Sequence, residues 1–161
     1  MEEGTYLCLY PDAMIDLDGI DPALHGGVLA LAKEMREHGH LPADPMREIF
    51  GFLGDRWTTL ILLVLQMGTW RHAELKRAIS RLGSEGKISQ RVMTAKLRAL
   101  ERDGLVVRET SPHVPPRVSY ALSESGSGLV CEIDRLRTWV HSRQADIETA
   151  RARFDRDVNG A

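Results

Sequence analysis

Residues 89–122 read SQRVMTAKLRALERDGLVVRETSPHVPPRVSYAL, and this stretch decides the fold of the 161-residue chain. Apolar residues recur at helical spacing up to the glycine at position 104, where a helix can end. Two runs rich in β-branched residues follow, at 105–109 and 118–122. The residues between them, 110–117, contain three prolines, so we expect a wing-like loop that does not pair internally. The order predicts a helix at 89–103 braced by a β-hairpin.

The helix predicted at 89–103 has one apolar face and one polar face. On a wheel with about 100° per residue, Leu97 and Leu100 lie within roughly 40° of Met93. The arginines at positions 91, 98 and 102 fall on the opposite side. Ser89 suits the N-cap position, where its hydroxyl can accept a backbone N–H. We therefore expect a buried Met/Leu stripe behind an exposed polar surface.

The polar surface carries side chains suited to duplex DNA. Arginine can bridge O6 and N7 of guanine, glutamine can pair with N6 and N7 of adenine, and threonine can reach a base or a phosphate. In the loop, two prolines before position 117 restrict the backbone and lower the entropy cost of a contact there. The alternative is an ordinary solvated surface, and it weighs most for the arginines late in the helix. The residues expected to contact DNA are Ser89, Gln90, Arg91, Thr94, Arg98, His113 and Arg117.

Charge is unevenly distributed along the chain. Residues 56–118 hold 12 Lys/Arg against 5 Asp/Glu, a net charge of +7, whereas residues 1–55 carry −8 and residues 119–161 carry −1. The formal net charge of the whole chain is only −2. Because phosphate binding depends on local charge, the basic centre favours nucleic acid more than the total does.

Composition is that of an ordinary globular protein, with 43% apolar and 27% charged residues. No apolar run approaches the roughly 18 residues that cross a bilayer. The chain begins with acidic residues, where a secretory signal would have basic ones. The two isolated cysteines, Cys8 and Cys131, fit a reducing compartment. We expect a cytoplasmic protein with no membrane partner.

Helical periodicity extends on both sides of the opening stretch. It predicts helices at 22–38, 44–54, 57–67 and 72–79, and a polar turn at 80–87. A last long helix is expected from 124 to about 154, with Leu129, Ile133, Leu136 and Val140 on one face. We divide the chain into an N-terminal extension (1–43), a winged helix-turn-helix domain (44–123) and a C-terminal helix with a tail (124–161). The fold class is mainly α with a small β-hairpin wing.

No catalytic or metal-binding pattern stands out. Apart from His38 and His40, which are better explained as a solvated linker pair, the histidines have no ligand-type neighbour at metal spacing. There is no phosphate-binding glycine loop and no G-x-S-x-G nucleophile, so we expect no enzyme, no cofactor and no metal site. Four aromatic residues are candidates for a small-molecule cavity, although such residues more often belong to the core: Phe50, Trp57, Trp70 and Trp139.

Three segments occur in order: GDRWTTLILLVL (54–65), ISQRVMTAKLRALERDGLVVRE (88–109) and VPPRVSYALSESG (114–126). Together they resemble the HxlR-type (MarR-related) winged helix-turn-helix transcriptional regulators of bacteria, over about residues 44–140. The resemblance implies a homodimer that binds a pseudo-palindromic DNA operator with its recognition helices in successive major grooves. It also implies dimerisation through the N-terminal helices and the long C-terminal helix. A small-molecule effector is a further expectation.

Departures from the family pattern bear on regulation. Many members carry a cysteine, which in some of them senses oxidants, where this chain has Asp44, so we expect the usual redox switch to be absent. Cys8 does not match that position, and Cys131 is predicted to be a small buried residue of the last helix. The turn at 80–87 and the N-terminal extension are longer than is usual. The helix of the extension could add dimer surface or cover a ligand cavity.

The alternative from another functional class is a winged-helix module that binds protein and does not bind DNA. Such a module would usually present an apolar or acidic groove face, whereas this face carries Gln90, Arg91, Thr94 and Arg98. An affinity for duplex DNA that falls steeply with salt would favour the regulator.

Overall fold

The computed structural model describes residues 15–39, 44–83, 86–112 and 117–159. Its contacts divide the chain into two units, Met1–Glu48 and Ile49–Ala161. Helix α2 (Pro45–Gly54) crosses the division. The first unit contains a short 3-10 turn, η1 (Pro22–Leu24), followed by α1 (His25–His38). The Asp21 side chain accepts the backbone N–H of Ala23 and caps η1, which starts where the sequence predicts a helix; the α-helix itself begins three residues later, at His25.

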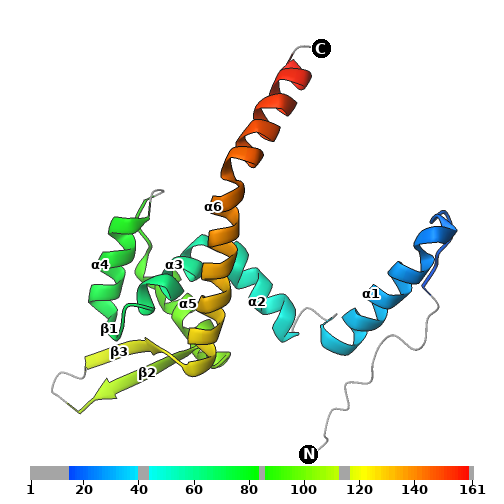
Figure 1. The fold of residues 1–161 in the computed structure, drawn as a ribbon. Helices are drawn as coiled ribbons and strands as arrows, with labels where there is room; N and C mark the ends of the chain where they lie inside the picture. The colour runs from blue at the N-terminus through cyan, green and yellow to red at the C-terminus, as the bar shows by residue number, and fades with distance from the viewer. Residues whose placement is uncertain (1–14, 40–43, 84–85, 113–116, 160–161) are drawn as a thin grey trace, which may run out of the picture. The chain divides into compact units, whose positions relative to one another are not determined.

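The second unit has the predicted winged helix-turn-helix fold (Figure 1). Three helices lead into a β-hairpin, and a long helix follows the hairpin. The elements are α3 (Arg56–Leu65), β1 (Trp70–Arg71), α4 (His72–Leu82), α5 (Gln90–Arg102), β2 (Val106–Ser111), β3 (Arg117–Leu122) and α6 (Glu124–Asn159). The sheet is antiparallel with the strand order β1-β3-β2.

The core of this unit forms around α3, whose apolar residues are buried on almost every side. Helix α4 contributes Leu75 and Ile79 to this core, and both are fully buried. Helix α5 contributes the predicted stripe of Met93, Leu97 and Leu100, each with no exposed surface. Burial of a side chain of this size contributes roughly 1.5–3 kcal/mol, so this stripe holds α5 firmly against α3.

The N-caps place the two central helices. The Asp55 carboxylate accepts the backbone N–H of Thr58 at 2.8 Å and caps α3. The Ser89 hydroxyl accepts the backbone N–H of Val92 at 3.2 Å and caps α5, as predicted. After α5 the chain turns into β2 at Gly104, whose φ of +69° favours glycine.

The hairpin differs from the prediction in two ways. Thr110 pairs with Val118 and Ser111 with Arg117, so the prediction of an unpaired loop over 110–117 is wrong at both ends. The first proline of the loop is Pro112, and the residues before it keep the N–H groups that a ladder needs. The sheet also gains β1, whose Trp70 pairs with Tyr120. A two-residue strand has no periodicity, so the sequence could not reveal it.

Helix α6 is anchored at its start and exposed towards its end. Gly126 lies so close to the backbone carbonyl of Leu105 that a β-carbon would collide with it, which lets the first turn of α6 pack on the start of β2. The side-chain amide of Gln66 donates to Asp134 at 2.9 Å and links the end of α3 to α6. Beyond Ile133 most of the helix is exposed, and in Figure 1 this part extends away from the other elements of the unit.

Candidate nucleic-acid interface

The exposed face of α5 gathers most of the predicted contact residues. Ser89, Gln90, Arg91 and Arg98 are exposed, and Thr94 is half-buried. Arg91 and Arg98 lie opposite the Met93 stripe and Gln90 and Thr94 on its flank, as the helical wheel predicts. A rigid helix that is held from behind and presents Gln, Arg and Thr at its N-terminal end can offer those side chains to a major groove.

His72 lies beside the start of α5, and no pattern in the sequence points to it. The amide nitrogen of Gln90 is 3.3 Å from its Nδ1, and the hydroxyl of Thr94 is 3.5 Å from its Nε2. The Tyr120 ring of β3 lies with its centroid 6.0 Å from the imidazole. Burial, and then the nearby charge of Lys76, lower the pKa of His72 from its ordinary value of 6.5. The ring is therefore neutral at pH 7.

An ion pair fixes the middle of α5 to the start of α3. The Lys96 ammonium lies 3.0 Å from the Asp55 carboxylate. Partial burial acts to raise the pKa of Asp55, but hydrogen bonds from the hydroxyl and backbone N–H of Thr58, together with Lys96, outweigh it and hold the pKa below its ordinary 3.8. At the other end of α5, Arg102 pairs with Asp103 at 2.8 Å, which draws this late arginine into a local contact.

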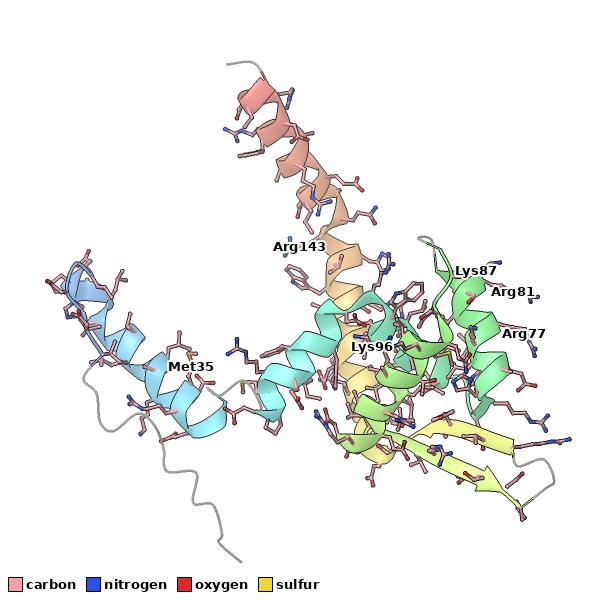
Figure 2. All side chains as sticks on the ribbon, turned by 180° about the vertical axis from the view of Figure 1, so that it is seen from behind. Met35, Arg77, Arg81, Lys87, Lys96 and Arg143 are labelled. Carbon is pink, nitrogen blue, oxygen red and sulfur yellow. The ribbon has the colours of Figure 1, made fainter. Side chains whose placement is uncertain are left out.

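Helix α4 adds a basic face to the residues that were predicted from the sequence. Three cations of α4 and Lys87, which follows the turn after the helix, together with Ser80 line an open hollow of about 340 Å³; we call Lys76, Arg77, Arg81 and Lys87 the α4 basic face. Figure 2 shows the labelled Arg77, Arg81 and Lys87 side chains along the outer side of α4, pointing away from the body. Within the described part of the chain, none of the four has an acidic partner within ion-pair distance. The signal in the sequence was the spacing of cations in KRAISR.

Of the two candidate residues of the wing, the structure describes only Arg117. Arg117 is the exposed first residue of β3 and pairs with Ser111. It therefore projects from a strand and not from a loop. Arg108 of β2 is also exposed, in the same hairpin. His113 lies outside the described residues.

The structure does not bring the four candidate aromatic residues into one cavity. Trp57 lines an open hollow of about 490 Å³, next to Leu60, Leu82 and Gly83. The other three do not line this hollow. Phe50 is 65% exposed and Trp139 57% exposed, while Trp70 lies in β1.

Three other predictions concern cysteine, metal and membrane. Cys131 is exposed on α6, so the prediction that it is buried is wrong: Val130 and Ile133 take the inward positions of that turn. Within residues 15–39, 44–83, 86–112 and 117–159, no group of three or more His, Cys, Asp or Glu side chains gathers as metal ligands do. In the same ranges, no helix combines the length and the apolar character of a membrane span.

A family model described as HxlR-like helix-turn-helix matches residues 52–148, more than half of the chain. The chain belongs to this family. The match confirms the resemblance found in the sequence. It covers the whole of α3, α4, α5 and the sheet, together with most of α6. The candidate interface on α4 and α5 therefore lies within the region that the chain shares with this family of transcriptional regulators.

Individual relatives of the chain support this assignment. The chain is 32% identical to the HTH-type transcriptional regulator YtfH of Escherichia coli strain K12, over 76% of this chain and 94% of the relative. It is 41% identical to an HTH-type transcriptional regulator of Methanothermobacter thermautotrophicus, over 54% of this chain, and the match spans 62% of that relative's length.

Solved structures show the same fold. The structure of the transcriptional regulator YtfH from Salmonella typhimurium is similar with a TM-score of 0.56 and 30% identity, covering 70% of this chain and 95% of that one. The reduced form of the transcriptional regulator YodB from Bacillus subtilis is similar with a TM-score of 0.51 and 33% identity, covering 60% of this chain and 89% of that one.

Proposed function

We propose that this HxlR-like protein regulates transcription as a homodimer on a pseudo-palindromic DNA operator, with α5 of each copy in a major groove. The observation that carries the proposal is the two-sided character of α5. Its inner stripe is fully buried, and its outer face presents Gln90, Arg91 and Thr94 where a helix N-terminus can approach DNA. In this proposal Ser89 contacts a phosphate, and Arg98 and Arg117 contact the flanking backbone.

The α4 basic face extends this surface to the DNA backbone. In a helix-turn-helix the first helix crosses the backbone beside the groove that the second helix enters. Lys76, Arg77, Arg81 and Lys87 are cations without an ion-pair partner among the described residues, so they are available for phosphates. We assign to them the part of the affinity that does not depend on sequence.

The dimer rests on α6. Its apolar stripe begins in the core at Leu129 and Ile133 and continues along one side of the helix, within roughly 60° on a wheel of about 100° per residue. The stripe comprises Leu129, Ile133, Leu136, Val140, Ile147, Phe154 and Val158. Leu136 is 51% exposed and Phe154 67% exposed, and a second copy would cover them. The apolar residues of α1 in the first unit, among them Leu31 and Met35, are a further dimer surface in this proposal.

An effector has one candidate site. The hollow beside Trp57 has a volume within the usual range of small-molecule sites and is lined mostly by apolar side chains. It also touches Leu82 and Gly83, where α4 ends and the turn to α5 begins. A small apolar ligand bound there would contact the end of α4 and so affect the placement of α5.

The proposed divisions of the chain are 1–43, 44–123 and 124–161, and the proposed place of action is the cytoplasm, where the operator lies.

The experiment that tests the proposal is selection of DNA from a randomised duplex pool by the full chain. We expect an enriched inverted repeat with half-site centres about one helical turn, roughly 34–36 Å, apart. We expect its affinity to fall steeply with salt, and two chains to bind each duplex. A protein that enriches no sequence, binds no duplex in a salt-dependent way and forms a stable complex with another protein would instead be the interaction module.

A further inference from the structure

We propose that His72 is a positioning residue for DNA recognition: it orients the side-chain amide of Gln90 and thereby sets the preference for adenine at the base that Gln90 reads. The proposal rests on the proposed function, because it requires that α5 enters a major groove. His72 itself touches no base in this proposal. It acts through Gln90 and, one turn further along α5, through Thr94.

The geometry brings three elements together at one imidazole. His72 is the first residue of α4 and directly follows β1. From α5, the Gln90 amide nitrogen lies 3.3 Å from Nδ1 and 3.5 Å from Nε2, and the Thr94 hydroxyl lies 3.5 Å from Nε2. From β3, the Tyr120 ring lies 6.0 Å away and tilted by 57°. The imidazole therefore contacts two side chains that are one helical turn apart on α5, Gln90 and Thr94.

The hydrogen-bonding capacity of each group requires a ring nitrogen without a proton. An amide nitrogen can only donate, so the ring nitrogen that pairs with Gln90 must accept. Either neutral tautomer offers one such nitrogen, and the Gln90 nitrogen lies within 3.5 Å of both ring nitrogens. The Thr94 hydroxyl can donate to Nε2 or accept from it, so it suits either tautomer. These contacts are long for hydrogen bonds, and a doubly protonated ring would leave the Gln90 nitrogen no acceptor.

The surroundings of His72 favour this neutral form. Burial and the charge of Lys76 on the same helix both lower the pKa of the imidazole. The groups that face it from the other elements are the uncharged Gln90 and Thr94 on α5 and the phenol ring of Tyr120 on β3. No described carboxylate pairs with it to hold a second proton on the ring.

The orientation matters because adenine recognition uses both ends of the amide. The carbonyl oxygen accepts from N6 of adenine while the nitrogen donates to N7. The amide nitrogen of Gln90 has two hydrogens, so it can donate one to His72 and the other to the base. A protonated imidazole would present N–H groups on both sides and would favour the flipped amide, which offers oxygen to the ring. Neutral His72 thus holds Gln90 in the orientation that suits adenine.

Three variants separate this role from a structural one. His72→Phe keeps a ring against Tyr120 but removes both nitrogens. His72→Asn places an acceptor oxygen near the position of Nδ1 and serves as the rescue. Gln90→Ala identifies the base pair that Gln90 reads, because preference at that pair disappears. Each protein is titrated with the selected operator, with the operator altered at that pair, and with unrelated duplex. Thermal unfolding of each variant shows whether it is folded.

We expect His72→Phe to lower the preference for adenine at that pair by about tenfold, within the range of a bidentate contact, without changing affinity for unrelated DNA. His72→Asn should restore most of the preference. In the Gln90→Ala background, His72→Phe should have no further effect on it. Lowering the pH through the depressed pKa of His72, which lies below the ordinary 6.5, should reduce the preference in the wild type and leave it flat in His72→Phe.

Equal losses on all three duplexes, or the same loss with and without Gln90, would overturn the proposal in favour of a structural role. If His72→Phe does not fold, the same conclusions follow from the wild-type pH profile and from His72→Asn, which should then keep the adenine preference. The proposed function fails separately: a wild type without salt-dependent operator binding would remove it, whereas a wild type that binds and an indifferent His72→Phe would remove only this inference.

Discussion

Helices α5 and α6 are both held by a buried apolar stripe, yet their exposed surfaces differ in kind. Helix α5 buries Met93, Leu97 and Leu100 completely and exposes polar and basic side chains. Helix α6 buries Val130 and Ile133 and then leaves large apolar residues exposed along its remaining length. A polar, cationic surface is stable in water and suits a polyanion. An exposed apolar stripe costs free energy in water until another protein covers it.

The same contrast appears in the ion pairs. Those along α6, such as Arg143 with Asp146, join residues three apart on one exposed face and contribute little. The pair between Lys96 and Asp55 joins α5 to α3 and is partly shielded from solvent. The cross-helix pair suits the recognition role proposed for α5, and the exposed apolar stripe of α6 suits the proposed dimer.

The largest effect is expected from a charge in the α6 stripe. Leu136→Asp should convert the dimer into a monomer, because it places a carboxylate where apolar side chains should meet. Operator affinity should then fall by about 100-fold or more, since the two half-sites are no longer bound together. Sedimentation equilibrium and DNA titration measure the two effects. Ala145→Asp, on the opposite side of the same helix, is the control, and a dimer that survives Leu136→Asp would refute this role of the stripe.

A smaller effect is expected from the recognition face of α5. Arg91→Ala should weaken operator binding by about 1–3 kcal/mol and relax specificity at one base pair if Arg91 reads a base. The dimer should persist, because Arg91 lies outside the α6 stripe. The matched control is Arg135→Ala, which removes an exposed arginine of α6. Unchanged operator affinity for Arg91→Ala would show that this face does not enter the groove.

The α4 basic face should affect all DNA alike. The double variant Arg77→Ala, Arg81→Ala should weaken the operator and unrelated duplex by the same factor. The slope of log affinity against log salt should become shallower by about 0.9 for each lost phosphate contact. Titrations at several salt concentrations measure this slope. A loss confined to the operator would instead mean that these arginines read sequence.

The smallest effect concerns folding alone. Asp55→Ala removes the N-cap of α3 and the partner of Lys96, and should lower the free energy of unfolding by about 0.5–2 kcal/mol. The pKa of Asp55 is depressed in the folded chain, so its contribution is present above about pH 4 and disappears as the pH falls through the lowered folded value. Urea unfolding at pH 7 and in the acid range measures this difference. Asp146→Ala is the control and should change neither quantity by a comparable amount.

Short-range patterns in the sequence predicted much of the interface. The stripe of α5, the Ser89 cap and the exposed positions of Gln90 and Arg91 follow from helical periodicity and from capping chemistry. The α4 basic face could have been found in the same way. The burial of Cys131 was predicted wrongly because a stripe specifies its face only to within a neighbouring position or two.

The sequence by itself determined which faces of α5 and α6 are apolar and where their helices begin, because these properties depend on residues within a few positions of one another. Only the tertiary structure placed His72 beside Gln90 and Thr94, paired Trp70 with Tyr120 and brought Lys96 to Asp55. These contacts join residues far apart in the chain, and they form only when packing of the shared core brings α3, α4, α5 and the sheet together.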